Sequence, residues 1–238
     1  MKMVVLAAGY GTRLAPLTDT VPKCLVDLDG LPLLQYWLEA FEDCDRLTEL
    51  VVNTHYLSKR VYDFLENWHS QKSITLTFEP ELLGTAGTIR SLSKWVGSEP
   101  LLVVHGDNFS SINLTQFIDS HMSRPFDSIG TMAYFTCENP HACGIIEIDS
   151  LGKVVSFLEK PERDIGRSAN AAVYVFEPEA LLEFFKCDLA TPDISLDIIP
   201  KLIGKLFSYE ISGFHVDVGS VSAYRKAQAI ASSLKKTC

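Results

Sequence analysis

The 238-residue chain lacks the features of membrane-spanning, secreted and nucleic-acid-binding proteins. No apolar run approaches the roughly 18 residues that a transmembrane helix needs. The first apolar run ends at a glycine loop, so we expect no signal peptide. The net charge of −9 argues against nucleic acid or an anionic membrane as the main partner, because an acidic surface is repelled by both. These absences together predict a cytoplasmic location.

Cysteine is present, but not in a pattern that indicates a disulfide framework or a metal centre. The six cysteines include no Cys-x-x-Cys pair and have no histidine-rich companion segment. Cys137 and Cys143 are the closest pair, and we interpret both as core or loop thiols. The chain also lacks internal repeats, low-complexity tracts and linkers, which favours one compact domain over residues 1–238.

Apolar runs of strand length alternate with amphipathic helical stretches in the first half of the chain. This alternation predicts a parallel sheet with helices on its faces. The second half is less regular and richer in strands, which predicts an antiparallel extension. The expected fold class is therefore α/β, a Rossmann-like three-layer sandwich with a mixed, mainly parallel central sheet. Expected strands cover 2–8, 50–53, 74–78, 101–104, 129–135, 144–148, 154–158, 171–176, 206–211 and 215–218, and expected helices cover 33–41, 57–68, a segment beginning near 85, 178–185 and 220–235.

The segment from Leu6 to Leu14, Leu-Ala-Ala-Gly-Tyr-Gly-Thr-Arg-Leu, carries the strongest chemical signal. Glycines let consecutive backbone N–H groups turn toward one anion. Arg13 adds a planar cation suited to phosphate oxygens, and Lys23 adds a more mobile charge. The loop is not a dinucleotide fingerprint, because Leu14 stands where a third glycine is required, and it lacks the Gly-Lys-Ser/Thr of a P-loop. Alone, it is either a simple turn or a phosphate cradle of another kind.

Gly9, Glu79 and Asp107 fall just past the ends of three expected strands. Ligands of parallel sheets bind at the carboxyl ends of the strands, so these residues are expected to meet at one site. Plainer interpretations exist for the same segments. Thr85 would be the N-cap of a helix, and Asp107 would be a turn residue.

These segments together resemble the signature of the sugar-1-phosphate nucleotidylyltransferases, Gly-x-Gly-Thr-Arg-x-x-Pro-Leu-Thr followed by Pro-Lys. The chain has Gly9-Tyr-Gly-Thr-Arg-Leu-Ala-Pro-Leu-Thr18 and then Pro22-Lys23, and family-like segments cover nearly its whole length. The resemblance implies the nucleotide-diphospho-sugar transferase fold, with a nucleotide-binding half over about 1–110 and a sugar-phosphate-binding half, including the small antiparallel extension, over about 111–238. It implies Mg²⁺-dependent transfer of a nucleotidyl group from an NTP to a sugar-1-phosphate, with release of pyrophosphate.

The resemblance also assigns catalytic and metal-binding roles. Arg13, Lys23 and Asp107 would be catalytic. Asp107 would share one Mg²⁺ with Asp217, for which the plainer interpretation is an acidic residue before a helix. His105 and His215, next to these aspartates, are expected to pack rather than to bind metal.

Further residues are assigned to the two substrates. In Glu159-Lys160-Pro161, the glutamate would bind sugar hydroxyls and the lysine the sugar phosphate, although alone they would form an ordinary exposed pair. The expected nucleotide-binding residues are Leu6, Ala7, Ala8, Gly9, Gly11, Thr12, Arg13, Lys23, Glu79, Gly84 and Thr85. The expected sugar-phosphate-binding residues are Gly144, Glu159, Lys160 and Asn170.

The Gly84-Thr-Ala-Gly87 segment after Glu79 looks most like guanylyltransferases that act on mannose-type or heptose 1-phosphates, so GTP is the favoured nucleotide. The alternative is the same reaction with UTP, as in N-acetylmuramate- or hexose-1-phosphate uridylyltransferases. No hexapeptide-repeat extension is seen, which favours the compact members. An NDP-sugar-using glycosyltransferase is disfavoured because no Asp-x-Asp follows the central strand, and a non-catalytic nucleotide sensor because the cations and aspartates are present. The sugar stays unnamed, and a homo-oligomer is left open.

Overall fold

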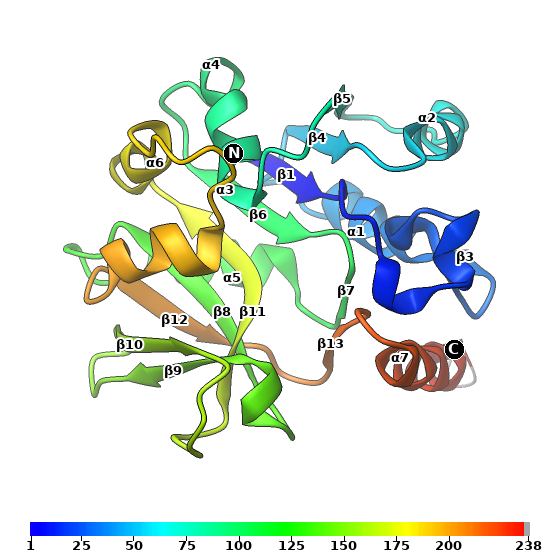
Figure 1. Ribbon diagram of the computed structural model, residues 1–238. Coiled ribbons are helices and arrows are strands. Elements are labelled where there is room, and N and C mark those ends of the chain that lie inside the picture. The colour runs from blue at the N-terminus through cyan, green and yellow to red at the C-terminus, as the bar shows by residue number, and fades with distance from the viewer. Residues whose placement is uncertain (236–238) are drawn as a thin grey trace.

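The computed structural model describes residues 1–235, and in that range one central sheet has nine strands (Figure 1). Its order is β10-β9-β11-β6-β1-β4-β5, and β8 pairs with both β11 and β12. The strands are β1 (Lys2–Leu6), β4 (Glu49–Thr54), β5 (Ser73–Phe78), β6 (Leu101–His105), β8 (Gly130–Thr136), β9 (Gly144–Ile148), β10 (Val154–Glu159), β11 (Ser168–Phe176) and β12 (Leu206–Glu210).

The two halves of the sheet differ in strand direction. β1 lies parallel to β4 and β6, and β4 lies parallel to β5. β11 runs antiparallel to β6, and β8, β9 and β10 continue with antiparallel pairs. The mixed, mainly parallel α/β sheet with an antiparallel extension is therefore confirmed, and the carboxyl ends of β1, β4, β5 and β6 lie at one edge.

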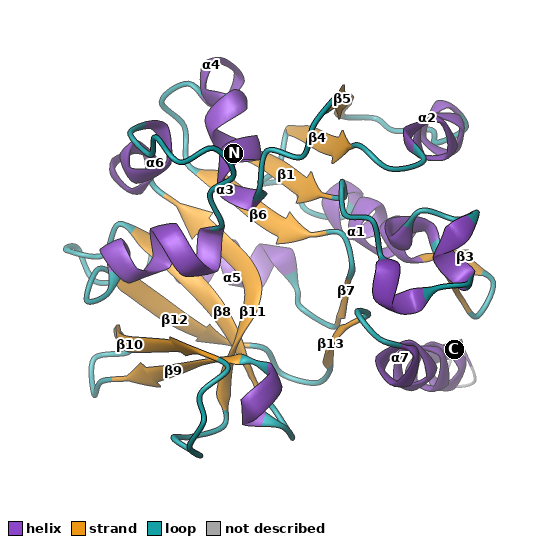
Figure 2. Cartoon of the chain, in the orientation of Figure 1, coloured by secondary structure: helices purple, strands orange, loops and turns teal. Residues whose placement is uncertain are grey.

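Helices cover both faces of the sheet (Figure 2). They are α1 (Leu33–Glu42), α2 (Ser58–Glu66), α3 (Thr85–Ser91), α4 (Ser93–Val96), α5 (Leu114–Met122), α6 (Pro178–Phe185) and α7 (Val221–Lys235). Side chains alternate across a strand, and the alternation in β1 divides the core. Met3 and Val5 pack with α1, α2 and α5, whereas Val4 and Leu6 pack with α3 and α6.

Two short two-stranded sheets complete the site edge. β2 (Asp27–Leu28) pairs with β3 (Leu31–Pro32), and β7 (Asn108–Ser110) pairs with β13 (His215–Asp217). The second pair sets Asp217 opposite Asn108, which follows Asp107 directly. Figure 1 shows the last helix, α7, next to the β2–β3 hairpin, so the end of the described chain closes against its first part.

The predicted strands and helices are all present within a few residues of their expected bounds. β1 ends at Leu6 instead of residue 8, because the loop to the phosphate cradle begins there. The sequence analysis did not predict α5, the β2–β3 and β7–β13 pairs, or the π-helical turn Ile194–Ile198. Cys238 lies outside the described residues, and the other five cysteines are unpaired thiols. Within residues 1–235, no helix is long and apolar enough to cross a bilayer.

His121 on α5 is a fully buried imidazole with a hydrogen-bond partner at each ring nitrogen. Its Nε2–H donates to the Glu177 carboxylate (3.1 Å), and its Nδ1 accepts from the Thr131 hydroxyl (2.8 Å). Arg124 already neutralises Glu177. Burial, with the Arg124 charge in addition, lowers the pKa of His121 from 6.5 to about 3.

We expect this imidazole to make the fold acid-sensitive. His121 binds a proton near pH 6.5 in the unfolded chain and at about pH 3 in the folded chain. The free energy of unfolding therefore falls as the pH is lowered from 6.5 toward 3. Between pH 7 and 4.5, urea titrations of the wild type should show a loss about 1–3 kcal/mol larger than those of His121→Gln. His69→Gln, which changes an exposed histidine, should follow the wild type. Parallel curves for the wild type and His121→Gln would contradict this.

Candidate active site

Two cavities that share His105 and Asp107 lie at the carboxyl ends of the parallel strands. The smaller has a volume of about 210 Å³ and the larger about 410 Å³. A further narrow space at Lys23 and Cys24 is lined by Leu6, Ala7, Gly9 and Asp107. The predicted convergence of Gly9, Glu79 and Asp107 is therefore observed.

The smaller cavity collects most of the expected nucleotide-binding residues. Those that line it are Leu6, Ala8, Gly9, Glu79, Gly84 and Thr85, joined by Asn53, Leu82 and Thr88, which were not predicted. Ala7 and Lys23 line the narrow space, and Arg13 lines the larger cavity. Gly11 and Thr12 line none of these three spaces. Gly11 instead holds the loop, because it adopts a φ of +69° and its carbonyl accepts from the Thr18 hydroxyl at 2.8 Å.

Glu79 is a buried carboxylate with three hydrogen bonds to its own protein. Oε1 accepts from Asn53 Nδ2 (2.7 Å) and from the Thr88 hydroxyl (2.6 Å), and Oε2 accepts from the Leu83 backbone N–H (3.2 Å). A carboxylate has about four acceptor sites. The cavity thus has a negatively charged wall with acceptor capacity left for a ligand.

The expectation that Thr85 is the N-cap of α3 is wrong. Gly84 occupies that position, with a φ of +78°, and Thr85 is the first helical residue. The Thr85 hydroxyl donates to Asp193 Oδ2 (3.0 Å) and accepts from the Ile194 backbone N–H (2.8 Å). Thr85 therefore ties the small cavity to the segment around Asp193, a contact between residues 108 positions apart that local sequence cannot reveal.

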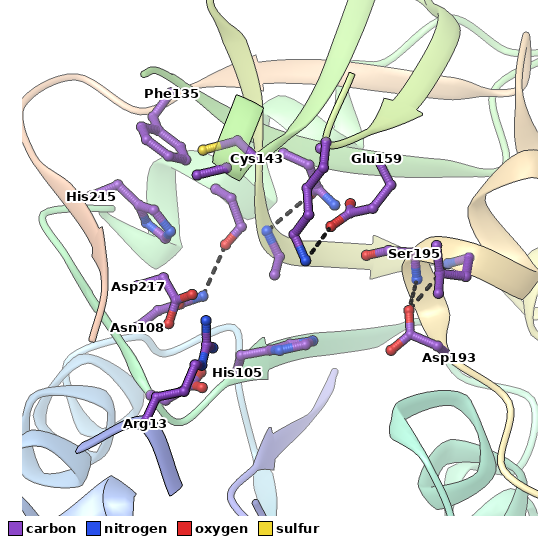
Figure 3. Close-up of a pocket in the computed structure, with 18 residues that line it drawn as sticks. Arg13, His105, Asn108, Phe135, Cys143, Glu159, Asp193, Ser195, His215 and Asp217 are labelled. Atoms are coloured by element: carbon purple, nitrogen blue, oxygen red, sulfur yellow. Dashed lines mark hydrogen bonds and ion pairs between the residues drawn. The ribbon is translucent and has the colours of Figure 1, made fainter. Parts of the chain in front are cut away.

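The larger cavity gathers all four expected sugar-phosphate residues, Gly144, Glu159, Lys160 and Asn170, together with Arg13, Asp107 and Asp217 (Figure 3). In Figure 3, Arg13 and His105 lie on one side, and Glu159 and Ser195 on the other. The Asn170 amide is already engaged, because Nδ2 donates to the Tyr174 hydroxyl (2.7 Å) and Oδ1 accepts from the Ala172 N–H (2.9 Å).

Local backbone geometry explains why position 144 is a glycine and how the backbone of Lys160 is held beside the larger cavity. A Cβ at Gly144 would lie 2.6 Å from Phe157 Cε2 and 2.7 Å from Glu159 Oε2, so a side chain there would displace Glu159. Lys160 has a φ of +48°, a strained region for a residue with a side chain. Its backbone N–H donates to the Cys143 carbonyl (2.9 Å), which holds it in that conformation.

Lys23 connects the two expected metal-binding aspartates. Its ammonium forms an ion pair with Asp107 and reaches Asp217 Oδ1 at 3.5 Å, and Lys23 is only 9% exposed. Burial raises the pKa of Asp107, but the Lys23 and His105 charges outweigh this effect and hold the pKa below its ordinary value. Since one cation contacts an oxygen of each carboxylate, the two carboxylates are close enough to share a cation.

The residues of the larger cavity that were not predicted as site residues include His105, Asp193, Ser195 and His215. His215 packs as expected, with its ring 4.7 Å from that of Phe135, and burial lowers its pKa to about 3. Alternation along β13 nevertheless places His215 on the same face as Asp217. The Nδ1 of His215 and the Nε2 of His105 are buried without a hydrogen-bond partner among the described residues.

Comparison with known proteins identifies the family. The model of the family described as Nucleotidyl transferase matches residues 2–233. This chain belongs to the nucleotidyl transferase family. It is 31% identical over 232 residues to the rice (Oryza sativa subsp. japonica) protein named Probable mannose-1-phosphate guanylyltransferase 2, covering 94% of this chain and 63% of that protein. The mannose-1-phosphate guanyltransferase of Saccharomyces cerevisiae is 29% identical, with 92% and 61% covered.

These relatives are longer than this chain, which spans less than two thirds of their length. A solved structure of a UDP-glucose pyrophosphorylase complexed with UDP-glucose has the same fold. It superposes with a TM-score of 0.81 at 20% identity and covers 98% of both chains. The family resemblance and the fold class predicted from sequence are therefore confirmed.

We predict that Gly84→Ala damages this nucleotidyl transferase more than the same change at Gly97. Both glycines have a positive φ outside the left-handed helical region, so alanine costs about 1–3 kcal/mol at either position. A Cβ at Gly84 would also lie 2.5 Å from the Pro192 carbonyl oxygen, whereas nothing lies within 4 Å at Gly97. Thermal unfolding should show a larger loss of stability for Gly84→Ala. Equal losses would mean that the segment at Pro192 moves freely.

Proposed function

We propose that this protein transfers a nucleotidyl group from an NTP, with GTP preferred, to a sugar-1-phosphate and releases pyrophosphate. The observation that carries the proposal is the pair of cavities that meet at Asp107. One has a volume of about 210 Å³ and is bordered by Gly9 and Gly84, which leaves room for a base. The other is larger and polar, and its lining combines carboxylates with Arg13 and Lys160. The reacting phosphates would lie where the cavities meet.

The reaction needs no nucleophile from the protein. A phosphate oxygen of the sugar-1-phosphate attacks the α-phosphorus of the NTP, the bond from that phosphorus to the α–β bridging oxygen breaks, and pyrophosphate leaves with the electron pair. Catalysis then consists of positioning two anions and stabilising the charge that develops. Arg13 and the loop amides would hold the departing pyrophosphate, Lys23 the α-phosphate, and Lys160 the incoming phosphate.

The residues present fit a divalent cation with oxygen ligands. The larger cavity is lined by four carboxylates, those of Asp107, Glu159, Asp193 and Asp217, against the two cations Arg13 and Lys160. Two polyanionic substrates would be repelled by this excess of negative charge. Among residues 1–235 no cluster of three or more His, Cys, Asp or Glu could hold a metal ion. This agrees with the preference of Mg²⁺ for one or two carboxylates plus phosphates and waters.

Asp107 and Asp217 would hold Mg²⁺, which when bound supplies positive charge at the reacting phosphates. Lys23 contacts both carboxylates. The ammonium of Lys23 would then turn toward the α-phosphate, so that its contact with the carboxylates would be exchanged for one with the substrate.

The buried carboxylate of Glu79 supports GTP over UTP. Guanine presents two neighbouring donors, N1–H and N2–H. One of them would take the acceptor site that the protein leaves open on Glu79, and the other would lie beside the same negative charge. Uracil presents one N3–H between two carbonyl groups, which a carboxylate would repel. The mannose-1-phosphate guanylyltransferase relatives in rice and yeast point to the same nucleotide.

Pyrophosphate release tests the proposal directly. GTP, UTP, dTTP and CTP are each combined with a panel of sugar-1-phosphates in the presence of Mg²⁺. We expect turnover with GTP and one class of sugar-1-phosphate. Turnover with UTP alone would replace the guanylyl assignment with a uridylyl one, and silence with no NTP binding would overturn the proposal.

Glu79→Gln tests the origin of the nucleotide preference. A hydrogen bond to a charged acceptor contributes about 1.5–3 kcal/mol, so kcat/KM for GTP should fall about 10- to 100-fold, with a smaller fall for UTP. Glu81→Gln changes a neighbouring exposed carboxylate and serves as the matched control. An equal fall for both nucleotides would show that Glu79 supports the fold without reading the base.

Asp107→Asn should weaken the binding of a divalent cation. Replacing one of two carboxylate ligands lowers the negative charge of the site, so we expect binding of Mn²⁺, used as a spectroscopic probe, to weaken at least about tenfold. Asp63→Asn, which alters an exposed aspartate paired with Lys59 on α2, is the control. Unchanged Mn²⁺ binding in Asp107→Asn would remove Asp107 from the metal site.

A further inference from the structure

The end of β4 joins the phosphate loop to the small cavity through two side chains. Asn53 is the last residue but one of β4, and His55 follows the strand. Successive side chains of extended backbone alternate in direction, so residues two apart lie on the same face. Neither residue belongs to the phosphate-loop signature or to the segment at Glu79. Asn53 and His55 nevertheless each contact both of these segments.

Asn53 makes the inner connection. Its Oδ1 accepts from the backbone N–H of Ala7, at the start of the loop, at 2.7 Å. Its Nδ2 donates to Glu79 Oε1 at 2.7 Å and to the Thr88 hydroxyl oxygen at 3.2 Å. Asn53 is 2% exposed, so all three bonds are shielded from water.

His55 makes a second connection nearer the surface. Its Nδ1 lies 2.8 Å from the carbonyl oxygen of Glu79, and its Nε2 lies 2.9 Å from the Tyr10 hydroxyl. A carbonyl only accepts, so Nδ1–H donates to Glu79. Nε2 of the neutral ring then accepts the hydroxyl hydrogen of Tyr10. The Tyr10 ring also packs edge-on against His55, with centroids 5.2 Å apart.

We propose that Asn53 and His55 are positioning residues that hold the phosphate loop and Glu79 in one fixed relation, so that the triphosphate and the base of a nucleotide are bound together. This inference rests on the proposed function, because it requires a nucleotide that spans the loop and the small cavity. Tyr10 is the tip of the loop and stands between Gly9 and Gly11, and a Cβ at Gly9 would meet nothing within 4 Å. Without the bond to His55, this backbone would have to be ordered when the nucleotide binds, which costs affinity.

Tyr10→Phe removes the hydroxyl and leaves the ring. Loss of one net hydrogen bond predicts that GTP, measured by calorimetry with Mg²⁺ present, binds about two- to tenfold more weakly. Guanosine, which lacks the phosphates that the loop would bind, should bind as it does to the wild type. Tyr56→Phe is the matched control, because it removes a neighbouring hydroxyl that donates to the Asp19 carbonyl instead. It should leave both affinities unchanged.

His55 variants separate the two halves of the connection. His55→Asn keeps a donor near the position of Nδ1 but removes the acceptor for Tyr10, so it should weaken GTP binding as much as Tyr10→Phe does. The double variant should be no weaker than either single variant, because all three lack the same bond. His55→Gln, which places an acceptor near the position of Nε2, should restore part of the affinity.

Three results would overturn the proposal. GTP affinity could be the same in Tyr10→Phe as in the wild type, the two single effects could add in the double variant, or guanosine could weaken as much as GTP, which indicates general loosening of the fold. The wild-type measurement separates this inference from the proposed function. A wild type that binds neither GTP nor UTP overturns both, whereas a wild type that binds and variants that do not differ from it overturn only the positioning role.

Discussion

The ammonium of Lys23 lies between the carboxylates of Asp107 and Asp217, and the geometry of the whole site depends on this contact. Two carboxylates at one sheet edge repel each other unless a cation lies between them. The three residues come from the loop after β1, the turn after β6 and the late strand β13. The ion pairs therefore draw three distant parts of the chain to one point. The small antiparallel pair β7–β13 holds Asp217 in register with that point.

Parallel pairing of β1 with β4 and β6 is the second constraint, because it puts the phosphate loop, the Asn53–His55 segment and Asp107 at one edge. The antiparallel half then brings β9, β10 and β11 past the same edge, and the larger cavity lies between the two halves. The larger cavity and the smaller one thus meet at His105 and Asp107. The division of the chain into a nucleotide half and a sugar half remains a proposal, although the lining residues of the two cavities agree with it.

The acidic character of the site has a consequence for specificity. Carboxylates outnumber cationic side chains along the cavities, so ligands must supply donors, metal ions or both. Glu79 is already held by three donors from the protein. It cannot turn away to suit a base with the opposite pattern without breaking its bonds to Asn53, to Thr88 and to the Leu83 N–H, which is costly in the interior. Such a rigid carboxylate is a better basis for discrimination between bases than a mobile surface residue.

Much of the fold and the candidate site could be predicted from the sequence. The alternation of apolar runs indicates the parallel sheet, and glycine-rich turns after apolar strands indicate where ligands bind. Gly9, Glu79 and Asp107 were found in this way, because they follow strands directly. Asp193 and Ser195 were missed, since they lie in a π-helical turn with no periodic pattern. Asn53 was missed because it is a single polar residue after an apolar run, and such a residue is interpreted as the end of the strand.

The sequence by itself determined which residues are charged, which turns need glycine and which strands are buried, because these properties depend on neighbours a few positions away. The tertiary structure alone decided which groups pair. The bonds from His55 to Tyr10 and to the Glu79 carbonyl, and from Thr85 to Asp193, join residues 45, 24 and 108 positions apart. No local pattern encodes such contacts, because the partners are far apart in the sequence. They meet only when strand pairing brings the ends of their strands to one edge of the sheet.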